Sequence, residues 1–560
     1  MAGVCAVCAV SALGSLPLGC NQAAPAPIPG DSNEDAPARR GGILHLASFQ
    51  DIRNLDPAGP SDGLSAEPQH LLFAGLVDFD DRGHLVADLA DHWEIADGGR
   101  TYRFVLRQGV TMHDGSELVA DDVKRSVERA LHRTTPNPNA SYFAGITGYR
   151  AFASDLTDHL AGVSVEGRYI VSFHLDEPDA TFLPMMTMHT LRPVCRSAGD
   201  RYRDDWTPCG AGPFKFAEWQ PGTLLRLVRH DAYFRPGLPF LDGVEWSFNM
   251  QLVAQRFRFS EGELDVLRDL TQSDQRRFAA DARWKRLAGV DADKRVYGES
   301  MNTRMAPFDN VEVRRAVAAA IDREHYRLLA PGYMTVLTQL IPPGVPGYDA
   351  NVAGQRYDYA AALEHMRKAG YPYDPATGQG GWPTPIVYPL YDRGLLVFTA
   401  QLLQEQLARI GLRIELRLMS WQAFLTLQER PGAAALSQGA WEMDYPDPSS
   451  FFDPLFTTGA IPEAGHNVAF YSNGRVDHLV AEAHRELDPE RRRDLYREAD
   501  TILCDEAPWA FAYGYHRFYV RQPYVRDLTP HPVWPLEATR AWIDRVSDAG
   551  FARLLRGAIR

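Results

Sequence analysis

The chain has 560 residues and a formal net charge of −14, from 58 Lys and Arg residues and 72 Asp and Glu residues. Hydrophobic residues make up 45% of the chain and charged residues 23%, a globular composition that excludes a mainly disordered, collagen-like or coiled-coil protein and leaves room for several domains. An acidic chain without a long basic segment is a poor nucleic-acid binder, because phosphate contacts need clustered Lys and Arg. Beyond the N-terminus no apolar run reaches 18 residues, so we expect no membrane-spanning helix in the body of the chain.

The first segment, residues 1–20, is apolar, uncharged and rich in small residues, and it ends in Leu-Gly-Cys at Cys20. This pattern is similar to a bacterial lipoprotein signal, in which the cysteine becomes the lipidated first residue of the mature chain. It departs from that pattern in lacking a basic leader and in having Pro17, so an ordinary cleaved signal peptide is the alternative. The polar, Pro- and Ala-rich residues 21–40 are expected to be a flexible linker.

Three cysteines remain after the predicted signal and its terminal Cys20, namely Cys195, Cys209 and Cys504. We expect a disulfide between Cys195 and Cys209, because they enclose a short loop and an exported protein lies in an oxidising compartment. Cys504 lies on an apolar helical face, which favours a buried free thiol. None of the cysteines has the spacing of a zinc site.

From Gly41 onward the pattern is typical of an α/β protein. β-branched and aromatic residues predict strands, and apolar residues at intervals of three or four predict amphipathic helices. The expected elements of the first part are, in chain order, a strand at 101–106, a helix over 119–131, strands at 169–175 and 224–228, and a helix around 310–321 that starts after the capping residues Asp309 and Asn310.

The clearest unit lies at residues 400–418, where a helix ends at Gly411 and a strand follows. Strict alternation in that strand predicts that one face is turned to the core, with Leu412, Ile414, Leu416 and Leu418 on it. A long helix is expected after Asp488, with proline at its first position. Helix and strand alternate on both sides of the middle of the chain, which indicates two α/β lobes.

Catalytic motifs are scarce. Residues 59–63 match the nucleophile-elbow string G-x-S-x-G, but no buried strand precedes Ser61 and Pro60 interrupts the entry. A secreted serine hydrolase is therefore an unfavoured alternative. The sequence holds no zinc-protease helix, phosphate loop or dinucleotide fingerprint, and its 17 histidines form no convincing ligand pair, so we expect neither a metal nor a cofactor.

Seven blocks, taken together and in one order, resemble the extracellular solute-binding proteins of family 5, which are the oligopeptide- and dipeptide-binding components of ABC importers. The resemblance extends from about Gly41 to about Asp527. The blocks are LADHWEIADGGRTYRFVLRQGVTMHDGSELVADDVKRSV (89–127), GAGPFKFAEWQPG (210–222), RHDAYF (229–234), MNTRMAPFDNVEVRRAVAAAIDR (301–323), RKAGYP (367–372), AWEMDYPDPSSFF (440–452) and LDPERRRDLYREADTIL (487–503).

The resemblance implies an α/β, two-lobed, periplasmic-binding-protein type II-like fold with a hinge and an extra inserted subdomain. The two hinge crossings fall near residues 300 and 522, and they let the lobes close on a ligand. The implied units are a base domain of lobe one at 41–73, 199–300 and 523–560, the inserted subdomain at 74–198, and lobe two at 301–522.

The block at 440–452 carries the implied ligand site. In peptide-binding members of the family, an aspartate after the aromatic residue of this block binds the peptide's α-ammonium group, and the match gives that role to Asp444. A carboxylate suits a primary amine in a closed cleft, because a charge-assisted hydrogen bond strengthens as water leaves. The alternative is that Asp444 caps a turn before Pro446.

By the same match Ala440, Trp441 and Glu442 line the site, partly through main-chain groups. In an extended segment Glu442 and Asp444 point to the same side. A second negative charge there favours a cationic or amine-bearing ligand.

Two further places are implied by the resemblance. In the family, the loop that follows residues 55–57 pairs with an extended peptide through main-chain hydrogen bonds, which do not depend on the side chains of the peptide. We therefore expect Ser61, Asp62 and Gly63 of this loop to contact the ligand. Near the second hinge crossing, Tyr513 or Tyr515 is expected either to stack on the ligand or to belong to the core.

The implied function is capture of peptides or related small solutes between the lobes and delivery to the permease of an ABC importer. No catalysis is implied. A nickel chelate, an opine or an oligosaccharide are alternative ligands within the family. We expect a monomer in the periplasm or cell envelope, held at the membrane by a lipid on Cys20.

Overall fold

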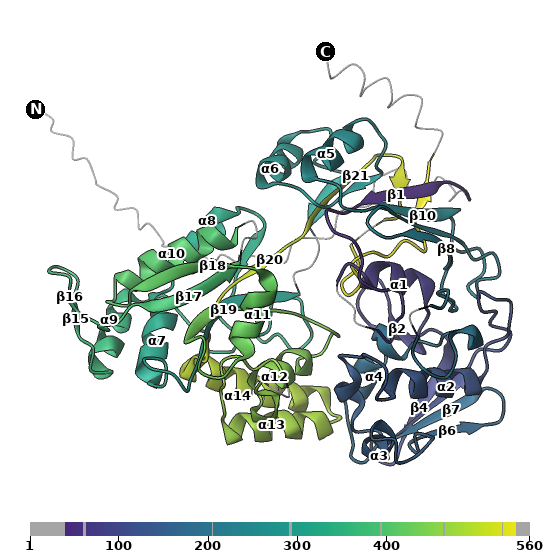
Figure 1. Cartoon of the computed structure of the whole chain (residues 1–560), viewed down its shortest axis with the longest axis horizontal. Helices are drawn as coiled ribbons and strands as arrows, with labels where there is room; N and C mark the ends of the chain where they lie inside the picture. Colours follow the sequence, from purple (N-terminus) through teal and green to yellow (C-terminus); the bar gives the residue numbers. More distant parts are fainter. Residues whose placement is uncertain are drawn as a thin grey trace, which may run out of the picture.

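The structure is a computed structural model that describes residues 40–59, 63–203, 205–290, 294–391, 395–462, 465–528 and 530–544. It contains two lobes that lie side by side, with helices packed on mixed sheets in each (Figure 1). The expected α/β, two-lobed architecture is confirmed. The predicted signal, the linker up to residue 39, Ser61 and Asp62 lie outside the described residues.

The base of lobe one is a four-stranded sheet in the order β1-β10-β9-β8, in which β1 runs parallel to β10 and the other pairs are antiparallel. Alternating leucines explain its packing, because Leu225 and Leu227 are fully buried while their neighbours along β9 are not. The strands are β1 (Ile43–Ala47), β8 (Phe214–Gln220), β9 (Leu224–Arg229) and β10 (Gly243–Ser247). The helix α1 (Ala66–Leu72) lies nearby.

A second four-stranded antiparallel sheet follows within lobe one, in the order β4-β5-β7-β6. The predicted helix is confirmed as α2 (Ala120–Leu131), whose Val123 and Val127 are buried against this sheet. The other elements are β2 (Val77–Phe79), β3 (Leu85–Ala87), β4 (Ala90–Ala96), β5 (Thr101–Leu106), η1 (Ala140–Phe143), α3 (Tyr149–Ala153), β6 (Val163–Glu166), β7 (Ile170–His174), α4 (Phe182–Met185), η2 (His189–Leu191) and η3 (Arg196–Ala198).

Lobe two holds a sheet in the order β14-β20-β13-β19 and a separate parallel pair, β17 and β18. Its strands are β13 (Arg295–Met301), β14 (Met334–Val336), β15 (Tyr373–Asp374), β16 (Gln379–Gly380), β17 (Ile386–Tyr391), β18 (Ile414–Met419), β19 (Leu436–Glu442) and β20 (Trp509–Tyr515). Its helices are α7 (Val311–Ala320), α8 (Arg323–Leu329), α9 (Tyr359–Lys368), α10 (Leu396–Ala408), α11 (Trp421–Glu429), α12 (Ser449–Phe456), η4 (Thr458–Ala460), α13 (Gly474–Arg485) and α14 (Pro489–Glu506).

A small sheet in the order β11-β21-β12 lies where the two lobes join, near the top of Figure 1. The chain passes between the lobes after β12 and again after β20, close to the expected hinge crossings. The elements here are α5 (Leu252–Ser260), β11 (Val266–Leu267), α6 (Gln272–Ala280), β12 (Ala288–Val290) and β21 (Phe518–Arg521), followed by β22 (Val525–Arg526) and β23 (Trp542–Ile543).

The strongest local patterns of the sequence recur in the structure. Gly411 has a φ of +82°, as expected of a residue that ends a helix, and Asp488 caps α14 through the backbone N–H groups of Glu490 and Arg491. One prediction is wrong: Leu418 is 61% exposed, although the alternation of β18 places it on the core-facing side. Among the described strands β18 pairs only with β17, so the end of its apolar face remains uncovered.

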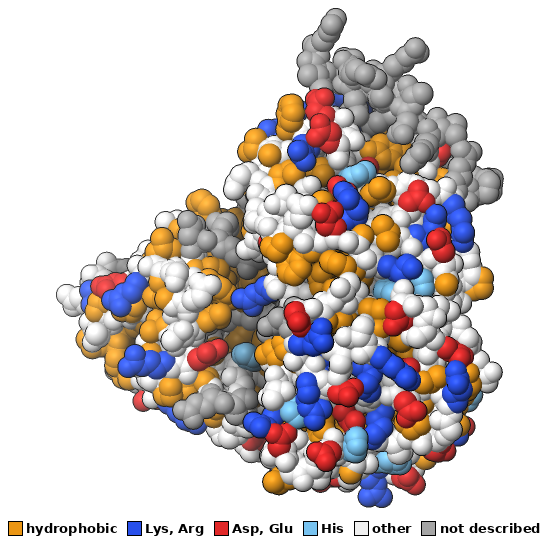
Figure 2. All heavy atoms as spheres, turned by 45° about the vertical axis from the view of Figure 1, so that its right-hand side comes forward, with side chains coloured by type: hydrophobic (Ala, Val, Ile, Leu, Met, Phe, Trp, Pro, Cys, Tyr) orange, Lys and Arg blue, Asp and Glu red, His pale blue; other side chains and the backbone are white. Residues whose placement is uncertain are grey.

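The surface agrees with the charge analysis. On the face that Figure 2 brings forward, basic and acidic side chains are interspersed, without a continuous basic stripe. None of the helices that the structure describes is long and apolar enough to cross a membrane.

Candidate functional site

The candidate site begins where β19 ends. This strand forms one edge of its sheet in the part of the chain that the structure describes, and Ala440 near its end is exposed. An exposed edge offers main-chain donors and acceptors to an extended ligand. Asp444 follows two residues after the strand, and its side chain is exposed as well.

The side chain of Asp444 is exposed, yet the protein atoms around it weaken the solvation of its carboxylate. Burial raises the pKa of the Asp444 carboxyl most, a hydrogen bond from Tyr142 opposes this rise, the nearby Glu442 adds to it, and the pKa that results is about 6. A carboxylate whose charge is poorly solvated is stabilised when a cation binds beside it. The site is therefore suited to an ammonium group.

Tyr142 reaches Asp444 from the other lobe. Its hydroxyl donates to Oδ2 of Asp444 at 2.8 Å, and its ring packs edge-on against Tyr445 at 5.7 Å between centroids. The two partners are 302 residues apart in the sequence. No local pattern around η1 indicates this role, so sequence reasoning missed Tyr142. The backbone N–H of Asp444 donates to the hydroxyl of Ser450 at 2.8 Å, which fixes the turn after β19.

Glu442 is held by two arginines. Arg295 lies opposite Glu442 in the β13–β19 register and donates to its carboxylate at 2.8 to 2.9 Å, and Arg517 adds a contact at 3.3 Å. Although burial raises the pKa of Glu442, these cations outweigh it and hold the pKa at about 2. The expectation that Glu442 offers a second negative charge to the ligand is therefore wrong, because arginines already match that charge.

The loop implied by the resemblance approaches the same place. A Cβ atom on Gly63 would lie 3.5 Å from Nη2 of Arg517 and 3.9 Å from Oε2 of Glu442. The described end of that loop thus lies beside Glu442, and the structure brings Gly63, Glu442 and Asp444 into one region.

The aromatic candidates lie elsewhere. The indole N–H of Trp441 donates to the carbonyl of Ser450 at 2.7 Å, and the ring packs against the core of lobe two. Tyr513 is 6% exposed, and the rings of Tyr297 and Tyr326 stack against it at 5.0 and 5.6 Å. This placement fits the expectation that Tyr513 belongs to the core rather than the expectation that it stacks on the ligand. Tyr515 is half-buried at the end of β20.

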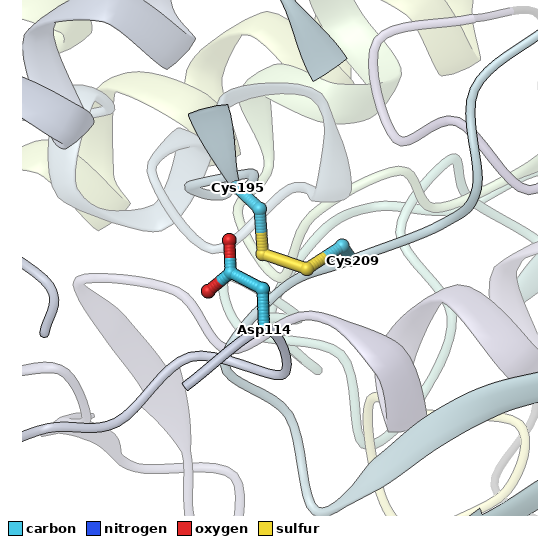
Figure 3. A group of neighbouring side chains, drawn as sticks. All are labelled: Asp114, Cys195 and Cys209. Carbon is cyan, nitrogen blue, oxygen red and sulfur yellow. A yellow bond between two sulfur atoms is a disulfide. The ribbon is translucent and has the colours of Figure 1, made fainter. Parts of the chain in front are cut away.

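Cys195 and Cys209 form a disulfide, with their Cα atoms 5.4 Å apart, and Cys504 is free and buried. Figure 3 shows the Asp114 carboxylate beside this disulfide. One carboxylate oxygen and both sulfur atoms lie within 4.8 Å of one another, but sulfur atoms joined in a disulfide are not thiolate ligands for a metal. This group therefore is no metal site while the disulfide is intact.

A cavity of about 710 Å³ lies inside lobe one. Tyr202, Trp206, Phe216 and Trp219 line it together with Arg53 and Asp56. Asp56 of this lining is held in a buried ion pair with Arg129, with oxygen and nitrogen 2.5 Å apart. Asp444 and Glu442 do not line this cavity, so we do not place the candidate site there.

Known proteins agree with this picture at the level of the whole chain. The sequence model of the family described as bacterial extracellular solute-binding proteins, family 5 middle, matches residues 84–463. The glutathione-binding protein GsiB of Salmonella typhi is 27% identical over 473 residues, which cover 83% of this chain and 87% of that protein. GsiB of Escherichia coli O6:K15:H31 is 26% identical over the same length and coverage.

Solved structures share the fold. A clavulanic acid biosynthesis oligopeptide binding protein 2 is 26% identical, with a TM-score of 0.80, over 90% of this chain and 96% of that one. The DppA periplasmic binding protein of Helicobacter pylori, in complex with the peptide STSA, is 23% identical, with a TM-score of 0.75, over 90% of this chain and 99% of that one. The type II-like two-lobed fold is confirmed by these likenesses.

Proposed function

The chain belongs to family 5 of the bacterial extracellular solute-binding proteins, and on this basis we propose that it captures a peptide between its two lobes and delivers it to an ABC importer. The relatives are solute-binding proteins rather than enzymes, so we assign no reaction to the cleft. A peptide with a free α-ammonium group is the ligand that the site supports best.

The observation that carries this proposal is the position of Asp444. Its carboxylate lies two residues beyond the end of an edge strand, is exposed, and accepts a hydrogen bond from Tyr142 of the opposite lobe. An extended peptide can pair with the β19 edge through main-chain bonds while its ammonium group reaches Asp444. Contacts with both lobes would stabilise the closed form, which is how a ligand drives closure.

The proposed contacts are Asp444 for the ammonium group, the main-chain groups of Ala440 and Glu442 for the peptide backbone, and Gly63 from lobe one. Ser61 and Asp62 are included from the family match alone. Trp441 contributes through its main chain in this scheme, because its indole is committed to Ser450. We leave Tyr513 out of the proposed contacts.

The test is a binding panel on the purified protein. Native mass spectrometry first identifies any co-purified ligand by mass. Calorimetry then compares glutathione, Met-Leu and Ser-Thr-Ser-Ala with maltotriose, nopaline and nickel-histidine. We expect at least one peptide to bind and the other classes to fail. Binding of a sugar, an opine or a nickel chelate in place of every peptide would contradict the proposal, and turnover of an ester substrate would favour the hydrolase alternative.

Anchoring and domain limits are also proposals. We propose that Cys20 carries a lipid that holds a monomer at a membrane of the periplasm or cell envelope, and that residues 74–198 form a subdomain inserted between 41–73 and 199–300. The Leu-Gly-Cys pattern before a polar linker supports the anchor. Cys20→Ser should move the protein from the membrane fraction to the soluble periplasmic fraction. A variant that stays with the membrane shows that Cys20 is not the anchor.

A further inference from the structure

The two lobes also meet away from Asp444, where α13 of lobe two approaches the segment that leads into α4 of lobe one (Figure 1). The backbone N–H of Ala180 donates to the carbonyl of His484 at 2.6 Å across this boundary. Leu487 packs over Gly99, where an added Cβ would lie 3.3 Å from the leucine methyl groups. The contact is therefore close-packed as well as hydrogen-bonded.

Two ionic contacts cross the same boundary. The ring of His484 lies between two carboxylates, 3.0 Å from Asp453 of its own lobe and 3.6 Å from Asp179 of the other lobe. Next to it, Arg485 contacts Glu177 of the other lobe at 2.5 and 2.7 Å. Lobe two thus presents two basic groups, His484 and Arg485, to two acidic groups of lobe one, Asp179 and Glu177.

Hydrogen bonds within lobe one hold Asp179 in position independently of its contact with lobe two. The hydroxyl of Tyr102 donates to the carbonyl of Asp179 at 2.6 Å. The backbone N–H and hydroxyl of Thr181 donate to the Asp179 carboxylate at 2.9 and 2.6 Å. A preorganised carboxylate loses little freedom when the lobes meet, so more of the interaction remains available for closure.

We propose that His484 and Arg485, with Asp179 and Glu177, form a latch between the lobes that stabilises their contact without a ligand and releases as the histidine loses its proton. The latch sets the fraction of ligand-free protein that is already closed. It thereby tunes the apparent affinity for ligand. A ligand that binds only the closed form has a higher apparent affinity when a larger fraction of the protein is already closed.

The direction of the pH effect follows from the charges around the ring. Burial by itself lowers the pKa of His484, but Asp453 and Asp179 outweigh it and raise the pKa well above its ordinary value. Opening removes the contact with Asp179, which raises the pKa of His484, and it also relieves the burial of the ring, which lowers that pKa, while Asp453 stays beside the ring. The attraction between His484 and Asp179 exists only while the ring is protonated, so the latch weakens with rising pH when the loss of this attraction outweighs the relief of burial.

Other charged groups lie close but are paired. One is Arg492 at the start of α14, which interacts with Asp179 but binds Asp447 at 2.5 and 2.7 Å and so adds little net charge. Tyr102, Tyr445 and Tyr496 interact with Asp179 or Asp453, and burial raises the pKa values of their hydroxyls above the ordinary range. His484 is thus the imidazole of this cluster, and its protonated form is the one that pairs with Asp179.

Single-molecule FRET on the ligand-free full chain, with one dye on each lobe, tests the latch and needs no knowledge of the ligand. Arg485→Glu and His484→Gln should each lower the closed-to-open ratio about twofold to fivefold, the range of exposed ion pairs. Glu177→Arg should restore the ratio in the Arg485→Glu background. The matched control is Arg475→Glu on the same helix, whose partner Glu498 lies 2.6 Å away within lobe two.

The pH arm uses the same labels between about pH 6 and pH 10. The closed fraction of the wild type should fall as pH rises, and that of His484→Gln should stay flat. The proposal is overturned if both latch variants match the control, if charge reversal at Glu177 restores nothing, or if His484→Gln keeps the pH response of the wild type. Because no ligand is added, these outcomes are independent of whether the protein binds peptides.

Discussion

Asp444 is the residue on which the binding proposal depends, and its surroundings predict how affinity changes with pH. Its pKa is about 6 without ligand, whereas a bound ammonium group would favour the ionised carboxylate and lower the pKa. Binding therefore releases a proton near that pH. The peptide α-ammonium group itself titrates near about pH 8.

We expect affinity for a peptide to rise up to about tenfold per pH unit between about pH 5 and pH 6, to level off, and to fall again above about pH 8. Calorimetry across this range measures it. Asp444→Asn keeps the size of the side chain but should remove the acidic limb of the profile. An acidic limb of equal slope in the variant would assign the titration to another group.

Glu299 predicts a stability effect unrelated to binding. It is 4% exposed, accepts a hydrogen bond from Tyr388 at 2.7 Å, and burial raises its pKa to about 7. When the pKa of a carboxyl group is higher in the folded state than in the unfolded state, its ionisation lowers the free energy of unfolding. This loss is largest above the folded-state pKa and disappears as pH falls toward the unfolded-state pKa near 4.5.

Glu299→Gln should therefore raise the free energy of unfolding by up to roughly 3 kcal/mol at about pH 8 and by little at about pH 4.5. Urea unfolding at both pH values measures the difference, with exposed Glu261→Gln as the control. A gain of the same size at both pH values would mean that ionisation of Glu299 is not its cause.

At the scale of single residues the sequence could indicate Asp444, because the block around it matches a family motif. It could not indicate Tyr142, which comes from a distant segment and meets Asp444 only when the lobes touch. It misjudged Glu442 for a related reason: the neutralising Arg295 lies on the neighbouring strand, and strand register cannot be read from composition.

At the scale of elements, local patterns were sufficient where a cap or a strong periodicity was present. The helix α14 and the strand β5 occur where the sequence predicts them, because proline with a capping aspartate and β-branched alternation are local signals. The exposed Leu418 shows the limit of such signals. Alternation defines the two faces of β18, but which part of a face is covered depends on the neighbouring elements.

The disulfide predicts an element-scale result. Cys195 and Cys209 close a loop with a sequence separation of 14 residues. Thiol counting on exported protein, unfolded without reductant, should find one reactive thiol among the three described cysteines, Cys504. Reduction should lower the free energy of unfolding by about 3 kcal/mol through loop entropy.

The matched control for this measurement is Cys504→Ser, which should leave no reactive thiol and keep the effect of reduction. Three reactive thiols in protein taken from an oxidising compartment would contradict the pairing of Cys195 with Cys209.

At the scale of the whole molecule, the two-lobed fold was predictable because several ordered blocks together resemble one family, and the family and structural likenesses confirm it. The relative placement of the lobes was not predictable from any block. The contacts of Tyr142 with Asp444 and of Arg485 with Glu177 each join residues about 300 positions apart, and only the assembled lobes create them.

The central claim is that the cleft holds a peptide by its α-ammonium group at Asp444. The most direct test is calorimetry with one peptide from the panel that binds, in free and N-acetylated forms, against the wild type and Asp444→Asn. For the wild type, acetylation should weaken binding by about 30-fold to several-thousand-fold, as expected when one partner of a buried charge pair is lost. Asp444→Asn should bind both forms weakly and without preference. Equal affinity of the wild type for the free and acetylated forms would contradict the account.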